Sequence, residues 1–310
     1  MTHVTEDEVW QKQEPKTLPW KDPKVISNHR RRKLSNNLVK IALVAVVLLA
    51  LYPLMDMLYL FALRGLEAIS VSRLILSTTP TGSGEPGGLA NAVQGTLVLI
   101  GMSSAISIPF GVFGGVYMAE FSKNTGRFAD AIRFVSDVIA GLPSIVLGYF
   151  GFLLFVLYFG WGFSAIAAGI TLSVIMFPYI LRTTELSIRK VPSSIREGAL
   201  ALGSTRTQMI NRLTLRFALP GILTGILLSI SIALGETAPL LYTAGISNQF
   251  PCATCLHTPV PYLTGIIWNF YTQPGPGYQD LAYLATFLLI SIVVVINIVA
   301  RFTIRRYSRI

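Results

Sequence analysis

The chain has 310 residues, of which 52% are hydrophobic and only 13% are charged. Soluble domains carry roughly 25% charged residues, so this composition excludes an ordinary soluble enzyme, a disordered chain and a fibrous repeat. The net charge of +10 does not indicate nucleic-acid binding, because the basic excess accompanies an unusually apolar chain. The composition indicates an integral membrane protein that spans the bilayer with α-helices.

Six stretches are apolar enough to cross roughly 30 Å of hydrocarbon as helices. In chain order they are residues 39–63, 90–119, 133–159, 162–182, 218–243 and 281–300. We therefore expect a polar, basic tail over residues 1–38 and an all-α domain of six transmembrane helices over residues 39–310. The first span is longer than the apolar region of a signal peptide, so we expect it to be a retained anchor.

The Lys and Arg residues predict the orientation of the chain. Of the 25, 23 lie in the tail, in the segments after the second and fourth spans, or after the last span, and only Arg64 and Arg73 lie on the other side. Cytoplasmic segments of membrane proteins carry such an excess of basic residues. The distribution predicts that both termini are cytoplasmic.

The sequence lacks the residues that several kinds of catalytic and binding chemistry require. The histidines His3, His29 and His257 all lie outside the spans, and the sequence has no P-loop for ATP. We therefore expect no catalytic site, no metal and no cofactor. Cys252 and Cys255 form a C-x-x-C pair in the segment after the fifth span, where an outer-face disulfide and two free thiols are both consistent with the sequence.

The loop at about residues 185–216 is long, basic and patterned as two short helices. Ser194 with Glu197, and Thr205 with Gln208, each have the spacing of a capping box. The apolar stripe comprises Ile195, Ala199 and Leu202, and Gly203 stands where a helix would end. A solvated surface helix and a docking element held out into the cytoplasm both fit this pattern.

The same loop carries a family resemblance. Glu197-Gly198-Ala199, followed by Gly203, resembles the E-A-A-x-x-x-G loop of ABC importer permeases, the transmembrane subunits of binding-protein-dependent transporters. Gly198 departs from the Ala of that pattern. The resemblance implies a fold like that of type I ABC importer permeases, with a coupling helix at 194–206 against an ATPase subunit. The implied coupling residues are Ile195, Glu197, Ala199, Leu202 and Gly203.

A motif in the fifth span makes the resemblance more specific, to one group of ABC importer permeases. Residues 235–241 read G-E-T-A-P-L-L, which is similar to the PstA-type permeases of phosphate importers, and residues 178–185 are similar as well. Relatives often have Arg where this chain has Ile232. The resemblance implies a non-enzymatic permease subunit in a bacterial inner membrane. It also implies a second permease, two copies of an ATP-binding subunit and a periplasmic or extracellular phosphate-binding protein as partners.

Two other transport functions remain as alternatives. A permease for another oxyanion, such as sulfate or molybdate, would share these motifs. An ion-coupled secondary transporter would be expected to show internal repeats and more titratable groups within its spans. Transport assays with the purified complex distinguish the two oxyanion importers.

Glu236 is expected inside the apolar fifth span. A carboxylate in hydrocarbon costs about 2.5–3.5 kcal/mol, so it must face a polar partner or a wet cavity. A gate or inter-subunit ion pair and a purely structural pairing, with Thr237 or a backbone amide, both remain open. Direct contact with phosphate is disfavoured, because like charges repel.

We assign the candidate translocation pathway to Glu236, Thr237, Pro239 and Arg182. Arg182 is expected at the inner end of the fourth span, where it would line the inner mouth or serve as a positive-inside anchor. Asp137 lies four residues after Arg133, a spacing that predicts an ion pair between them on one helix.

Overall fold

The computed structural model describes residues 23–71, 88–122, 126–251, 256–273 and 276–307, which are helical or irregular and contain no strand. Residues 1–60 and 61–310 form two compact units. Helix α2 (Pro23–Val71) includes the predicted first span, and it begins within the segment predicted as a polar tail. Residues 1–22 of that tail lie outside the described residues, and its boundary at residue 38 stays a prediction.

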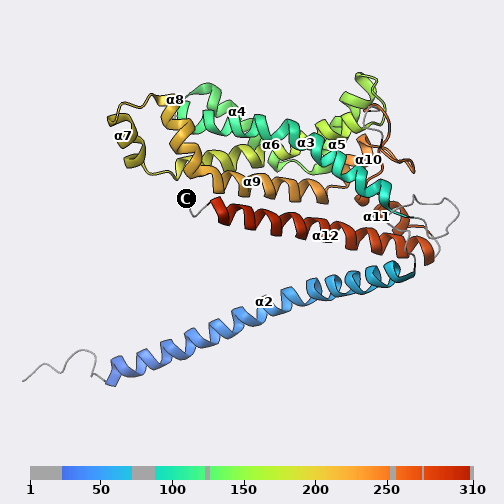
Figure 1. Cartoon of the computed structure of the whole chain (residues 1–310). Helices are drawn as coiled ribbons and strands as arrows, with labels where there is room; N and C mark the ends of the chain where they lie inside the picture. Colours follow the sequence, from blue (N-terminus) through green and yellow to red (C-terminus); the bar gives the residue numbers. More distant parts are fainter. Residues whose placement is uncertain (1–22, 72–87, 123–125, 252–255, 274–275, 308–310) are drawn as a thin grey trace, which may run out of the picture. The chain divides into compact units, whose positions relative to one another are not determined.

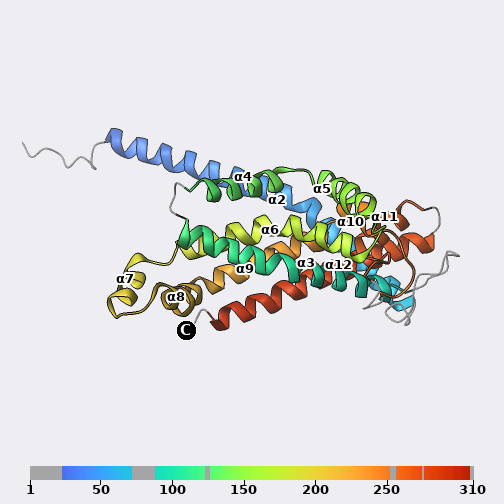
Figure 2. The same cartoon turned by 90° about the horizontal axis from the view of Figure 1, so that it is seen from above.

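Four long helices of the 61–310 unit lie side by side (Figures 1 and 2). They are α3 (Ala90–Val116), α6 (Ala165–Arg189), α9 (Leu215–Gly235) and α12 (Pro276–Tyr307). Helix α6 packs against α3 and α9 and is the most buried of the candidate spans, and α12 packs against α9. A Cβ at Gly115 would lie 2.5 Å from the Cβ of Thr184, so glycine is what lets α3 approach α6 this closely.

The third predicted span is not one straight helix. Helix α4 (Arg127–Gly141) is followed by α5 (Ser144–Gly151) and the π-helix η3 (Phe152–Tyr158), and the pair is bent by 105°. The prediction of a continuous span over 133–159 was wrong in this respect. Leu142 is extended, with ψ 139°, because the ring of Pro143 disfavours the helical conformation in the residue before it.

The fifth predicted span is also interrupted. Helix α9 ends at Gly235, and the short helix α10 (Ala238–Thr243) follows after a break. The prediction that Glu236 lies inside a continuous helix over 218–243 was therefore wrong. Glu236 has an extended backbone (φ −69°, ψ 129°), and Pro239 has no N–H with which to continue the hydrogen-bond ladder of α9.

The described residues contain five helices that are long and apolar enough to cross a membrane, or six when the bent α4–α5 pair counts as one span. This agrees with the six spans predicted from the sequence. The segment between the fifth and sixth predicted spans, 244–280, contains helix α11 (Leu263–Tyr271) and the first residues of α12. Helix α6 continues seven residues past Arg182, the predicted end of the fourth span, to Arg189.

The short elements that follow α3 and α6 lie at one end of the bundle formed by the 61–310 unit. The π-helix η2 (Tyr117–Phe121), helix α7 (Ser193–Ala201), helix α8 (Arg206–Met209) and the π-helix η4 (Ile210–Thr214) belong to this end. In Figure 1, α7, α8 and the last turns of α12 lie there, whereas α10 and α11 lie at the opposite end. The segments rich in Lys and Arg thus share one side of this unit, as the charge count requires.

Candidate functional site

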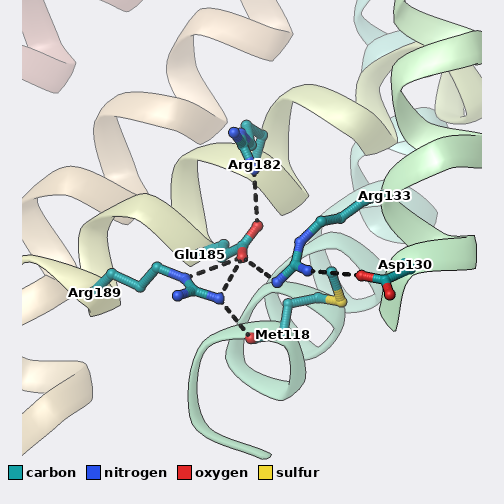
Figure 3. A network of polar contacts seen from close by, with 6 residues as sticks. All are labelled: Met118, Asp130, Arg133, Arg182, Glu185 and Arg189. Carbon is teal, nitrogen blue, oxygen red and sulfur yellow. Dashed lines mark hydrogen bonds and ion pairs between the residues drawn. The ribbon is translucent and has the colours of Figure 1, made fainter. Parts of the chain in front are cut away.

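A buried carboxylate surrounded by three arginines lies between α4 and α6 (Figure 3). The side chain of Glu185 is 2% exposed. Its Oε1 atom accepts hydrogen bonds from Arg133 Nη2 at 3.0 Å and Arg189 Nε at 3.1 Å, and its Oε2 accepts one from Arg182 Nη1 at 3.3 Å. A charge removed from water is tolerated only when it is paired and hydrogen-bonded, and this set of contacts meets that condition.

The Glu185 network connects three elements. Arg182, Glu185 and Arg189 share one face of α6, because residues three and four apart are neighbours on a helix. Arg133 comes from α4 and also binds Asp130 at 3.3 Å. Arg189 donates to the backbone carbonyl of Met118, in η2 at the end of α3, at 3.3 Å. The network therefore fixes α3, α4 and α6 relative to one another at this end of the bundle.

A cavity of about 220 Å³ lies next to this network. It is lined by one face of α4 and one face of α6, comprising Arg133, Ser136, Asp137, Ala140, Pro178, Tyr179, Leu181, Arg182, Thr183 and Glu185. The predicted ion pair between Asp137 and Arg133 is not formed, because Arg133 is bound to Asp130 and Glu185 instead. Arg182 lines this cavity, with 56% of its side chain exposed.

Glu236 lies where the two broken spans meet. The side chain of Ser144, the first residue of α5, lies close to the Glu236 carboxylate. The carboxylate is thus held beside the N-terminus of α5, where the helix dipole favours negative charge. On α11, Thr264 Oγ1 donates to the backbone carbonyl of Glu236 at 2.9 Å. The sequence offered Thr237, a backbone amide or a neighbouring subunit as partners and missed Ser144.

Helices α5 and α10 pack tightly just beyond this junction. A Cβ at Gly148 would lie 2.5 Å from the Cα of Pro239, so the backbones of the two helices are in direct contact there. Pro239 is buried near the start of α10, and Thr237 precedes that helix as its N-cap. The predicted pathway residues therefore fall into two groups: Glu236, Thr237 and Pro239 at the junction, and Arg182 in the cavity beside α4.

The basic loop forms two short helices, as predicted, with a difference at its start. Helix α7 begins at Ser193 after an extended Pro192, and no side chain caps it, so the predicted capping box of Ser194 with Glu197 was wrong. The second box is confirmed, since Thr205 and Gln208 cap each other at the start of α8. Pro192 occupies the N-cap position in place of Ser194, and proline has no side-chain acceptor with which to cap the helix.

The end of α7 has the geometry expected of Gly203. This residue has φ +82°, and the N–H of Ser204 bonds to the carbonyl of Ala199, which closes the helix with a left-handed turn. The predicted apolar stripe is only partly confirmed. Ile195 is half-buried and Ala199 is buried, but Leu202 lies past the last helical residue and is 90% exposed.

Two arginines attach this loop to the helical bundle. Arg196 of α7 lies 2.7 Å from the buried carboxylate of Glu120, in η2, and its Nη2 donates to the carbonyl of Ile188 at 2.6 Å. Arg206 donates to the backbone carbonyl of Glu120, and its guanidinium stacks on the ring of Phe121. Helix α7 is therefore bound to the ends of both α3 and α6.

The sequence interpretation assigned no role to Glu185, Arg189, Glu120, Arg196 or Ser144. A signal for the first two was present, because residues 182, 185 and 189 have the spacing of a charged helix face. Cys252 and Cys255 lie outside the described residues. Within the described ranges, no group of three His, Cys, Asp or Glu side chains is arranged to hold a metal ion.

Comparison with known proteins identifies the family. Residues 111–309 match the family described as the binding-protein-dependent transport system inner membrane component. The chain belongs to this family. It is 40% identical over 284 residues to the phosphate transport system permease protein PstA 2 of Mycobacterium bovis, with 92% of each chain covered. It is 35% identical to the phosphate transport system permease protein PstA of Yersinia pestis, covering 92% of this chain and 97% of that one.

The fold of this permease agrees with the family assignment. A solved bacterial alginate ABC transporter, in complex with an alginate pentasaccharide-bound periplasmic protein, contains a chain similar to it with a TM-score of 0.62. The similarity covers 89% of this chain and 96% of that chain at 16% sequence identity. The permease is therefore a multi-span membrane protein with the fold of ABC importer permeases, as the resemblance of its motifs implied.

Proposed function

We propose that this permease forms half of the translocation pathway of an ATP-driven ABC importer for inorganic phosphate. The observation that carries the proposal is the 40% identity, over 92% of the chain, to a permease named for phosphate transport. Arg182 of the α4–α6 cavity supports it chemically, because its Nε and Nη2 bond no other described residue and a guanidinium group can bind two oxygens of phosphate. Relatives often have Arg where this chain has Ile232, and Arg182 offers a guanidinium group at another place on this chain.

The proposed assembly contains a second permease subunit, two copies of an ATP-binding subunit and a periplasmic phosphate-binding protein. The chain is placed in a bacterial inner membrane with both termini in the cytoplasm, and the end of the bundle that carries α7 and α8 then faces the cytoplasm. The positive-inside rule supports this orientation. ATP hydrolysis is assigned to the partner subunits, and this chain moves the substrate.

Coupling to the ATP-binding subunit is assigned to residues 194–206. Glu197, Leu200, Leu202 and Gly203 are exposed on this segment, whereas Ala199 is buried against Met209 and Ile210. Leu200 and Leu202 are 47% and 90% exposed, which suits an apolar contact with a groove on another protein. The buried side of the segment holds it to the bundle, so a push on its exposed side would reach α3 and α6.

The gate is assigned to the junction of the two broken spans. Glu236 and Ser144 join the end of α9 to the start of α5, and the contact of Gly148 with Pro239 joins α5 to α10. Breaks of this kind are places where two helix segments can change angle. In the proposed cycle, closure of the ATP-binding subunits moves α7, and the junction opens or closes the pathway.

An importer for sulfate or molybdate remains the second candidate, since the same fold and coupling segment would serve it. Uptake distinguishes the two functions. Cells that lack their own phosphate importers are complemented with this permease and its partner subunits, and uptake of radioactive phosphate and sulfate is measured. Phosphate uptake that requires ATP and the binding protein supports the proposal. Uptake of sulfate or molybdate in place of phosphate overturns it.

A further inference from the structure

The α4–α6 cavity contains polar groups that the protein itself does not use. Ser136 lines it, and the Oγ of this residue, which is only 5% exposed, has no hydrogen-bond partner. Most buried hydroxyl groups are hydrogen-bonded, so an unbonded one in a residue that lines a cavity is a candidate donor for a molecule bound there. The cavity has a volume of about 220 Å³, several times the roughly 30 Å³ that one water molecule occupies in the liquid.

Arg182 supplies the strongest donors of this cavity. Its Nη1 is bound to Glu185 at 3.3 Å, while its Nε and Nη2 bond no other described residue. Arginine binds tetrahedral oxyanions with two parallel hydrogen bonds, and Nε with Nη2 forms such a pair. Together with the hydroxyl of Ser136, these groups make a set of donors suited to an oxyanion.

The cavity also contains an acceptor that most oxyanion sites would avoid. Asp137 lines it, and no described residue forms an ion pair or hydrogen bond with its carboxylate. The other lining carboxylate, Glu185, is bound by Arg133, Arg182 and Arg189 and is unavailable. A carboxylate can only accept hydrogen bonds, and it repels an anion that has no proton to donate. The charges of Arg182 and Asp137 balance, so the cavity does not favour anions in general.

We propose that this cavity is a binding site for an oxyanion that still carries a proton, and that Asp137 accepts a hydrogen bond from the hydroxyl group of that oxyanion. Near neutral pH, inorganic phosphate retains at least one proton, whereas sulfate retains none. The site is therefore selective for phosphate over sulfate within the permease itself, with Arg182 and Ser136 as donors. This inference rests on the proposed function, and it deepens that function by adding a point of selection on the pathway.

The site is close to the proposed gate along the chain. Ala140 lines the cavity, and Ser144, four residues later, lies beside Glu236 at the junction of the broken spans. A phosphate ion that passes the junction would therefore meet Arg182 and Asp137 next. Arg133 stays bound to Asp130 and Glu185, so its charge is already balanced by two carboxylates.

The test measures binding to the purified transporter complex without its binding protein and without ATP. The phosphorus NMR line of inorganic phosphate is recorded at millimolar concentration and pH 7, with sulfate or arsenate as competitor. We expect the complex to broaden the phosphate line. Added arsenate should reverse the broadening, whereas added sulfate should leave the line broadened. Asp137→Asn should weaken phosphate binding about tenfold, as expected for one hydrogen bond to a charged group, and should let sulfate compete.

Matched variants control for general changes of charge. Arg182→Gln should abolish the broadening, whereas Asp280→Asn and Arg301→Gln, at exposed positions of α12, should leave it unchanged. Equal competition by sulfate in the unmodified complex, or unchanged selectivity in Asp137→Asn, overturns the inference. Phosphate uptake by a complex that shows no such binding refutes this site while the proposed function stands. Sulfate uptake in place of phosphate refutes the proposed function.

Discussion

The guanidinium of Arg196 lies 2.7 Å from the carboxylate of Glu120, which joins helix α7 to the π-helix η2 at the end of α3. The Glu120 side chain is 4% exposed, so this is a buried ion pair rather than a surface contact. Arg189 binds the backbone of Met118 in the same π-helix and also binds Glu185. The protruding helix α7 is thus connected by direct contacts to the arginine network inside the bundle.

The Arg196–Glu120 pair predicts a defect in coupling that a second charge change repairs. Arg196→Glu places two carboxylates together and leaves a buried charge unpaired, which costs about 3–5 kcal/mol at a buried pair. We expect uptake to fail while the ATP-binding subunit still hydrolyses ATP. The double variant Arg196→Glu with Glu120→Arg should restore part of the uptake. A double variant no better than either single one would contradict the role of this pair.

The turn after α7 predicts a contrast between two glycines. Gly203 has φ +82°, so a bulky residue there costs about 1–2 kcal/mol and misdirects the end of the helix. Gly203→Leu should therefore reduce uptake and binding of the ATP-binding subunit, measured by co-purification. Gly198→Ala is the matched control, because no atom lies within 4 Å of the added methyl group. If both variants behave alike, the backbone of this turn does not determine coupling.

An exposed charge on α7 gives a separate test of the same surface. Glu197 is exposed and has no structural partner among the described residues, so Glu197→Lys should leave folding and membrane insertion intact. We expect it to lower uptake by weakening the contact with the ATP-binding subunit. Normal uptake and normal co-purification would remove Glu197 from the proposed contact.

The apolar spans and the charge pattern were predictable because they depend on composition along the chain. The breaks in the third and fifth spans were missed, although Pro143 and Pro239 were visible. Proline is tolerated in membrane helices where neighbouring groups bond the freed backbone, so its presence alone does not mark a break. Pro178 and Pro220, which lie inside continuous helices of this chain, illustrate the difficulty.

The candidate site was predictable only where its residues are local in sequence. The left-handed Gly203 and the capping box of Thr205 each depend on a few adjacent residues, and both were found. The partner of Glu236 is Ser144, 92 positions earlier, and the partner of Arg196 is Glu120, 76 positions earlier. Such pairs exist only once the helices have packed, and no spacing rule for a single helix can reveal them.

The Glu185 network predicts a large loss of stability when its acceptor is removed. Glu185→Gln leaves Arg133 and Arg189 partly buried without their shared carboxylate, at a cost of about 3–5 kcal/mol. The melting temperature of the purified complex measures this loss. Glu67→Gln is the control, because Glu67 and Arg64 are 69% and 56% exposed and such pairs contribute about 0–1 kcal/mol. Equal melting temperatures for the two variants would show that the network contributes no net stability.

The Glu236→Gln variant distinguishes a gating role of Glu236 from a purely structural role. Glutamine can still accept a hydrogen bond from Ser144, but it loses the charge that the N-terminus of α5 favours. We expect the abundance of the complex to stay close to normal while uptake falls several-fold. Immunoblotting of membranes and phosphate uptake in the same cells measure both quantities. Normal uptake would leave Glu236 with a structural role only.

The contact between α5 and α10 predicts that one added methyl group disturbs the junction. A Cβ at Gly148 would lie 2.5 Å from the Cα of Pro239, and backbone cannot move aside as a flexible side chain can. Gly148→Ala should therefore force the two helices apart, at a cost of about 1–3 kcal/mol typical of overpacking, and reduce uptake. Gly141→Ala, in the same broken span, is the control, since nothing lies within 4 Å of its added methyl.

The two alanine variants are compared by the melting temperature of the complex and by phosphate uptake. Because alanine is the better helix former, Gly141→Ala should be neutral or slightly stabilising. A lower melting temperature and lower uptake for Gly148→Ala alone would mean that the close approach of α5 to α10 is required for transport. If Gly148→Ala is as stable and active as Gly141→Ala, the junction tolerates separation, and the gate must lie elsewhere in the bundle.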